Sequence, residues 1–223
     1  MSWADDGKGA GPAQVLRVAA AAGMMRVPAC GGIGKTMRVD KDTGLLDAAV
    51  HIPSPNQDER PGDAEPELIV VHSISLPPGE YGGPHIAELF TNRLDPSGHP
   101  YFATIADLRV SAHLLIRRDG RMEQFVPFHR RAWHAGASCY QGREACNDFS
   151  IGIELEGTDE GDYETAQYET LVDVVEALCR AYPGLSPARL AGHSHISPER
   201  KTDPGPGFDW DRLGAMLGDL YRV

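Results

Sequence analysis

The chain has 223 residues, of which 41% are hydrophobic and 24% charged, a composition typical of a soluble globular protein. This length is enough for one domain with a sizeable core and a tail. The net charge of −11 repels phosphate backbones, so we expect no nucleic-acid partner. No apolar run approaches the roughly 18 residues that span a bilayer, so we expect no membrane partner either.

Residues 1–44 differ from the rest, with alanine- and glycine-rich stretches, scattered charges and little periodicity. We expect a disordered extension or an upstream start codon here, followed by one folded domain over 45–223. The stretch VLRVAAAAGMM has some features of a secretory signal, but Arg17 and Arg26 interrupt or bound it, and the residues before it include an acidic pair. Such signals begin with basic residues. We therefore expect a cytoplasmic protein.

The four cysteines form no CxxC pair. A Cys139–Cys146 disulfide is one interpretation of their spacing, but nothing else in the sequence indicates an oxidising compartment. We expect reduced thiols.

From residue 45 onward the pattern is that of a compact α/β domain. ELIVVH (67–72) is a continuous apolar run that ends in a histidine and predicts a buried central strand. Pro84 follows a loop and suits the first turn of a short helix. The segment 109–127 holds two strand-like runs around Asp119–Gly120, which predicts a β-hairpin.

The second half of the chain continues this alternation of strands and helices. SIGIELEG (150–157) alternates strictly and predicts a strand, and 165–182 has helical spacing that Pro183–Gly184 ends. ARLAGH (188–193) is a short strand candidate, and Asp209 is placed to cap a last helix. Interleaved strands and helices with one antiparallel hairpin indicate an α/β fold, a central mixed sheet flanked by helices.

Three of these strands carry reactive groups. His72 closes the first strand and His193 the last. On the alternating strand, the bulky apolar residues point one way, while Gly152, Glu154 and Glu156 point the other. Sites in open α/β sheets gather at strand ends, so these carboxylates could form the floor of a cleft. A half-exposed strand with a solvated acidic face is the competing interpretation.

The stretch GHSHISPERKTDPGP (192–206) raises the question of a metal site. If GHSH is extended, His193 and His195 point to opposite sides, so one metal would not use both. Asp203 follows across a proline-rich loop that could fold back. With His72, these residues would give two nitrogens, one oxygen and an open position, the composition of catalytic zinc sites. Polar loop histidines are the alternative, because the spacing is no short helix motif.

Six segments in this order resemble the zinc-dependent N-acetylmuramoyl-L-alanine amidases, most closely the branch that acts on anhydro-muropeptides. The resemblance runs from about Gly44 to Leu213 and has no counterpart for the N-terminal extension. The segments are VHSISLPPGEYGG (71–83), HPYF (99–102), LRVSAHLLIRRDG (108–120), RAWHAG (131–136), NDFSIGIELEGTD (147–159) and RKTDPGP (200–206).

The resemblance implies a role for each of five residues. The family's zinc ligands fall on His72, His193 and Asp203, which would hold one Zn²⁺ per chain. Its catalytic carboxylate falls on Glu154, and its conserved lysine, which would stabilise the developing oxyanion, falls on Lys201. The implied fold has the zinc at one edge of a substrate groove.

The resemblance also implies a reaction, the hydrolysis of the amide between the lactyl group of anhydro-N-acetylmuramic acid and L-alanine of the stem peptide. The substrate would be an anhydro-muropeptide released during cell-wall recycling, and the enzyme a monomer. The alternatives are a non-catalytic peptidoglycan-binding module and an exported wall amidase.

Several residues are weaker candidates for substrate binding. Ser73 stands where relatives have asparagine, which could hydrogen-bond substrate. His195 is a second departure from relatives, which commonly have aspartate there, but it leaves all three ligands intact. Arg109 could bind a peptide carboxylate. Trp133 and His134 could line the groove, although His134 could equally be a hydrogen-bonded anchor of its loop.

Overall fold

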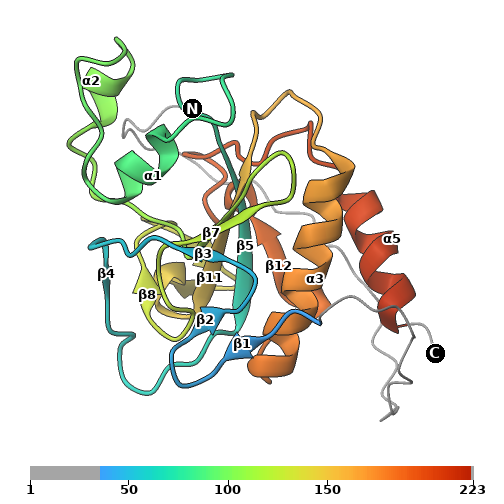
Figure 1. The fold of residues 1–223 in the computed structure, drawn as a ribbon. Coiled ribbons are helices and arrows are strands. Elements are labelled where there is room, and N and C mark those ends of the chain that lie inside the picture. Colours follow the sequence, from blue (N-terminus) through green and yellow to red (C-terminus); the bar gives the residue numbers. More distant parts are fainter. Residues whose placement is uncertain (1–35, 222–223) are drawn as a thin grey trace.

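The computed structural model describes residues 36–221, with side chains to residue 218 (Figure 1). Of the expected N-terminal extension, residues 1–35 lie outside the described residues, and with them the weak signal-like stretch and Cys30. Within them, Cys139, Cys146 and Cys179 are all free, as expected for reduced thiols. None of the helices in this part of the chain has both the length and the apolar character that a bilayer span requires.

A six-stranded sheet forms the centre of the fold. Its strands lie in the order β12-β5-β11-β6-β7-β3. The first four pair in parallel, β6 pairs with β7 antiparallel, and β7 pairs with β3 in parallel. The expected mixed sheet and hairpin are therefore confirmed. The strands are β3 (Val50–His51), β5 (Leu68–Ile74), β6 (Leu114–Ile116), β7 (Met122–Gln124), β11 (Ser150–Glu156) and β12 (Leu190–Gly192).

Two long helices cover one face of this sheet. α3 (Thr165–Ala181) and α5 (Trp210–Tyr221) lie side by side against it, drawn in orange and red in Figure 1. α3 begins with a capping box between Glu164 and Gln167, and the Asp209 carboxylate accepts a 2.8 Å bond from the backbone N–H of Arg212. The main core lies here. Alternate strand residues meet the apolar stripes of the helices in it, including Val71, Ile153, Leu171, Val175 and Leu213.

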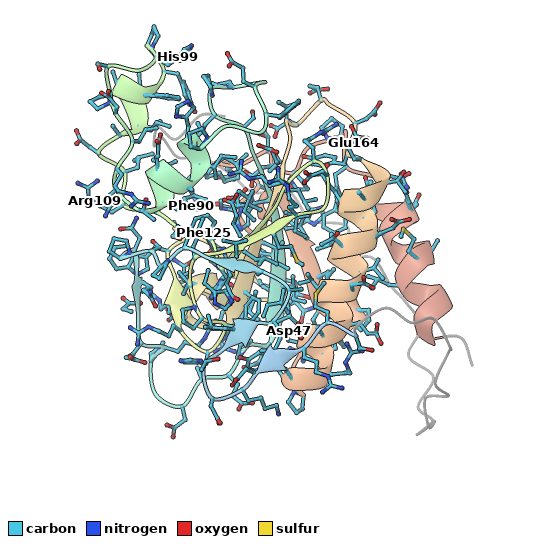
Figure 2. The ribbon with its side chains drawn as sticks, viewed as in Figure 1. Asp47, Phe90, His99, Arg109, Phe125 and Glu164 are labelled. Atoms are coloured by element: carbon cyan, nitrogen blue, oxygen red, sulfur yellow. The ribbon has the colours of Figure 1, made fainter. Side chains whose placement is uncertain are left out.

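The opposite face is covered by short elements and loops. α1 (His85–Phe90) and α2 (Phe102–Ile105), green in Figure 1, pack on a second apolar cluster that holds Phe90 and Phe125 in a T-shaped contact (Figure 2). A third cluster lies under α4 (His193–Ile196). The remaining elements are the two-stranded ladders β4 (Gln57–Asp58) with β8 (Arg131–Ala132) and β9 (Cys139–Tyr140) with β10 (Arg143–Glu144), and 3₁₀ turns at Cys146–Asp148 and Pro187–Arg189.

The folded part begins earlier than the sequence indicated. β1 (Val39–Asp40) pairs antiparallel with β2 (Leu45–Leu46), and Met37 and Val39 pack against the main core. The expected boundary after residue 44 therefore falls inside a hairpin. Strands of two residues are too short to show a period, so the pattern gave no signal here.

Candidate active site and metal centre

The register of the two central strands places His72 beside Glu154. β5 and β11 run parallel, and the two residues are direct partners across the pair. Side chains at paired positions share one face of a sheet, so both point away from the main core. They leave that face near the carboxyl ends of the strands, where sites of open α/β sheets are found.

His193 reaches the same place through a change from strand to helix. β12 ends at Gly192, and His193 begins the single helical turn of α4. The assumption that GHSH is extended is therefore wrong, because Ser197 N–H bonds the carbonyl of His193 at 2.9 Å and closes the turn, while Ser194 N–H bonds the carbonyl of Asp203 in the following loop. The separation of the two histidines still holds. His193 is buried, whereas His195 is exposed and accepts a 2.9 Å bond from Gly192 N–H.

The loop after α4 folds back, as its prolines and glycines indicated, and buries Asp203. Besides the Ser194 bond, Lys201 N–H bonds the carbonyl of Ser197 at 2.9 Å. Gly205 has φ +77°, and a Cβ there would lie 2.4 Å from Asp159 Cα. A side chain would push the two loops apart, so a glycine is required at this position.

Three side-chain atoms converge at this point. His72 Nδ1 lies 3.0 Å from His193 Nδ1, and each lies 3.1 Å from Asp203 Oδ2. The exposed fraction of each residue is 4% or less. Burial and the neighbouring His193 lower the pKa of His72 to about 4. Burial alone would raise the pKa of Asp203, but bonds with His193 and His72 outweigh it and bring the pKa below its usual range.

This donor set fits a metal ion. His193 Nε2 lies 3.1 Å from the carbonyl oxygen of Ala135, which can only accept, so the N–H sits on Nε2. Nδ1 is then the nitrogen that faces the carboxylate and can offer a lone pair to a metal ion. A histidine whose second nitrogen donates to a carbonyl is the usual arrangement for a metal ligand. His72, His193 and Asp203 can hold a metal ion here.

Glu154 and Glu156 share a strand and a face but differ in their surroundings. Glu156 accepts bonds from Arg117 at 2.8 Å and from Gly82 N–H at 2.7 Å. Glu154 is 7% exposed, and its Oε2 has no hydrogen-bond partner among residues 36–221. Burial, then the charge of Asp203, raises the pKa of Glu154 well above its usual value, and Lys201 opposes this in part. A buried carboxylate without a partner costs stability, which is typical of a catalytic group.

Lys201 lies next to these acidic groups. It is 6% exposed, and burial lowers its pKa to about 8, although Asp203 and Glu154 favour the charged form. Its ammonium group therefore adds positive charge to a site that is otherwise formed by carboxylates and imidazoles.

Comparison with known proteins agrees with this geometry. The sequence matches the N-acetylmuramoyl-L-alanine amidase family over residues 62–206. The chain belongs to this family. It is 61% identical to the 1,6-anhydro-N-acetylmuramyl-L-alanine amidase AmpD of Citrobacter freundii over 176 residues, which cover 79% of this chain and 94% of the relative.

Two solved structures extend the comparison. A crystal structure of a selenomethionine AmpD derivative superposes with a TM-score of 0.77 at 61% identity, over 79% of this chain and 98% of the other. The Escherichia coli amidase AmiD, in complex with its substrate anhydro-N-acetylmuramic acid-L-Ala-D-γ-Glu-L-Lys, gives a TM-score of 0.50 at 26% identity, over 82% and 66%. The protein is thus a hydrolase of the amidase family with the expected α/β fold.

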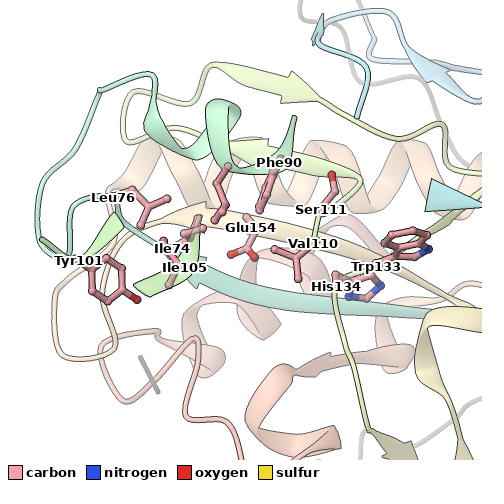
Figure 3. A pocket seen from close by; sticks show the side chains of 11 residues that line it. Ile74, Leu76, Phe90, Tyr101, Ile105, Val110, Ser111, Trp133, His134 and Glu154 are labelled. Carbon is pink, nitrogen blue, oxygen red and sulfur yellow. The ribbon is translucent and has the colours of Figure 1, made fainter. Parts of the chain in front are cut away.

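The amidase has a mainly apolar pocket at Glu154. Figure 3 shows the Glu154 carboxylate between Ile74 and Val110, with Trp133 and His134 at one end. The lining comes from β5, β11, the α1–α2 region and the loop after β8, and also includes Leu76, Leu89, Phe90, Tyr101, Ile105 and Ser111. An apolar cleft with one buried carboxylate in its wall is suited to a small organic ligand.

The four candidate substrate residues of the amidase have different surroundings. Half-buried Trp133 lines the pocket. Arg109 is exposed at the edge of the molecule, beside the α1–α2 region (Figure 2). Ser73 is completely buried on the face opposite His72, and its hydroxyl donates to Asp159 at 3.2 Å. His134 lines the pocket but bonds His72 and Ser150 through its two ring nitrogens.

Sequence reasoning missed two of these partners. Nothing in the chain pattern linked Ser150 or the Ala135 carbonyl to the histidines, since each contact joins segments far apart in sequence. The motifs RAWHAG, which holds His134 and Ala135, and NDFSIGIELEGTD, which holds Ser150, drew attention to these segments but not to the contacts between them.

Proposed function

We propose that this chain is a zinc-dependent amidase that hydrolyses the bond between anhydro-N-acetylmuramic acid and L-alanine in muropeptides. The observation that carries the proposal is the convergence of His72, His193 and Asp203 beside Glu154, whose Oε2 has no hydrogen-bond partner among the described residues. The name of the AmpD relatives and the substrate in the AmiD complex support the substrate class.

The ion is one Zn²⁺ per chain. Two imidazoles and one carboxylate match the donor types of catalytic zinc sites, which keep a further position open. Zinc in such a site provides a Lewis acid and allows water to act as a nucleophile at neutral pH. Because all three ligand residues are buried, little solvent competes with the substrate there.

Glu154 acts as the general base and then as the general acid. It accepts a proton from the attacking water and later delivers it to the amine of the leaving L-alanine. The raised pKa of its carboxyl group brings the group nearer to neutral pH, where one residue can serve in both directions. Its unpartnered Oε2 leaves an acceptor for the water proton.

Lys201 stabilises the negative charge that develops on the substrate carbonyl oxygen. Its burial strengthens this interaction, because water screens the charge less. The backbone bond of Lys201 to Ser197 holds its loop beside Asp203, so the ammonium group is positioned before substrate arrives.

The pocket beside Glu154 binds apolar parts of the muropeptide. Trp133 offers a large surface for the sugar or the lactyl group. Arg109, which is exposed at the rim, pairs with a carboxylate of the stem peptide. Ser73 and His134 play no direct part in this binding, because their polar atoms bond within the protein.

The enzyme works as a monomer in the cytoplasm, on fragments released during cell-wall recycling. The strong identity to relatives named for the anhydro-sugar supports this setting over an exported wall amidase. Fractionation of the native cells tests the compartment, and light scattering of the purified protein tests the monomer.

The decisive experiment measures metal content and product together. The purified full chain should contain about one zinc per chain and release anhydro-N-acetylmuramic acid and a free L-alanyl peptide, both identified by mass spectrometry. A chelator should stop the release, and added zinc should restore it. Binding of muropeptide without release would instead identify a binding module and overturn the proposal.

A further inference from the structure

A buried chain of hydrogen bonds leads away from His72 on the side opposite the ligand cluster. His72 Nε2 lies 2.9 Å from His134 Nδ1, and His134 Nε2 lies 3.1 Å from Ser150 Oγ. Ser150 Oγ in turn donates to the carbonyl oxygen of Cys146 at 2.6 Å. His72, His134 and Ser150 are 2%, 5% and 0% exposed, so water does not compete for these bonds.

The last acceptor fixes the direction of the whole chain. A carbonyl oxygen only accepts, so the Ser150 hydroxyl proton is committed to Cys146. The Ser150 oxygen then accepts from His134 Nε2–H. The ring of His134 is buried, and its two nitrogens face an imidazole and a hydroxyl, so it is uncharged and carries that one proton. Its Nδ1 is therefore a bare acceptor.

The same reasoning continues to His72. Because His134 Nδ1 accepts, the N–H of His72 sits on Nε2, and its Nδ1 carries a lone pair. This lone pair is directed towards His193 Nδ1 and Asp203 Oδ2, 3.0 and 3.1 Å away. We propose that His134 is a positioning residue which, together with Ser150, holds His72 in the tautomer that binds metal.

The surroundings of His134 prevent its ring from taking another position. A Cβ at Gly152 would lie 2.5 Å from the ring, so the glycine lets the imidazole rest on strand β11. The backbone N–H groups of His134 and Ala135 both donate to Asn147 Oδ1, at 3.1 and 2.8 Å. These contacts fix the backbone from which the ring extends.

The two histidine ligands are thus oriented in different ways. His193 donates to the main-chain carbonyl of Ala135, which no substitution removes. His72 donates to a side chain, so its tautomer depends on the identity of residue 134. Outer partners of this kind typically change metal affinity by 10- to 100-fold.

His134→Phe tests the proposal, because phenylalanine keeps a ring over Gly152 but offers no acceptor to His72. The zinc dissociation constant, measured by competition with a chromophoric chelator, should rise 10- to 100-fold. His134→Asn places an amide oxygen near the former Nδ1 and should recover most of the affinity. Equal losses in both variants would mean that His134 matters only for packing, and would overturn the proposal.

A second measurement needs no bound metal. In the full chain stripped of zinc, long-range ¹H–¹⁵N spectra at pH 7.5 should show the proton of His72 on Nε2. Ser150→Ala removes the acceptor of His134 Nε2–H and should shift His72 towards the Nδ1–H tautomer. Ser54→Ala is the matched control, since Ser54 is another buried serine that donates to a carbonyl, that of Phe90. It should leave the tautomer and the zinc affinity unchanged.

The positioning role of His134 rests on the proposed function, because it concerns a ligand of the metal that the amidase would use. The positioning role and the proposed function can nevertheless fail separately. If the chain releases no product while His72 keeps its Nε2–H tautomer in a Ser150-dependent way, the function is wrong and the positioning role stands. If His134→Phe cannot be purified folded, the Ser150→Ala spectra decide. Unchanged spectra and zinc affinity in Ser150→Ala would refute the proposal even in a fully active amidase.

Discussion

We expect Glu154 to destabilise the folded protein when no metal is bound. Its carboxyl group is buried, and Oε2 has no partner among residues 36–221. Glu154→Gln keeps the shape of the side chain and removes the charge. We expect this variant to lose activity by at least about 100-fold, the typical contribution of a general acid–base group. In the metal-free state it should unfold less easily than the wild type.

The size of this stabilisation follows from the shifted pKa. In the unfolded chain Glu154 ionises near its ordinary value of 4.5, whereas in the folded protein its pKa lies well above that value. Below pH 4.5 both states are protonated and the charge costs nothing. As the pH rises through the window between the two pKa values, the native state loses about 1.4 kcal/mol per pH unit. The advantage of Glu154→Gln should grow at that rate and then level off.

Glu156→Gln is the matched control on the same strand and face. Glu156 bonds the buried guanidinium of Arg117 and the N–H of Gly82. Its substitution leaves a buried charge with fewer partners and should cost about 1–3 kcal/mol. The two glutamate variants should therefore change stability in opposite directions.

Urea unfolding of the chelator-treated proteins at several values between pH 5 and 7.5 measures both effects. Metal must be absent, because a bound cation would favour the ionised form of Glu154. The reasoning would be refuted if Glu154→Gln destabilised the protein, or stabilised it by the same amount at every pH.

Three further predictions concern the remaining parts of the site and the fold. Lys201→Met should keep one zinc per chain and a near-normal KM while kcat falls by roughly 10²–10³, and full turnover would exclude the oxyanion role. His193→Ala should lose zinc in metal analysis, whereas His195→Ala should keep zinc and activity within a few-fold. A chain that starts at residue 36 should melt like the full chain. One that starts at residue 45 should melt at least about 3 °C lower, because β1 is lost, and equal melting temperatures would contradict this.

Much of the fold could be predicted because its main elements carry strong periods. The apolar run at 67–72, the alternation at 150–157 and the helix at 165–182 all occur within a residue or two of their expected bounds. The N-terminal hairpin and α4 could not be predicted. Both are short, and long-range contacts stabilise them, such as the bond from Ser194 to Asp203.

The site could be predicted only in part, for a similar reason. His72, His193 and Asp203 were identified because they follow strands or belong to family motifs, and the structure does bring them together. Ser73 was expected at the substrate, but alternate strand residues point to opposite faces, and it is buried on the far side from His72. The role of Ser150 depends on a contact with His134 that no local pattern encodes.

The site therefore depends on the register of a single strand pair. Glu154 and His72 are direct partners in the parallel pair of β11 and β5, and Gly152, one alternate position away, makes room for the ring of His134. A shift of one residue would turn Glu154 to the main core and bring an apolar side chain to the metal cluster. The apolar residues of β11 oppose that shift, because they fill the core under α3. The packing that stabilises the fold thus also holds the proposed base beside the proposed ligand.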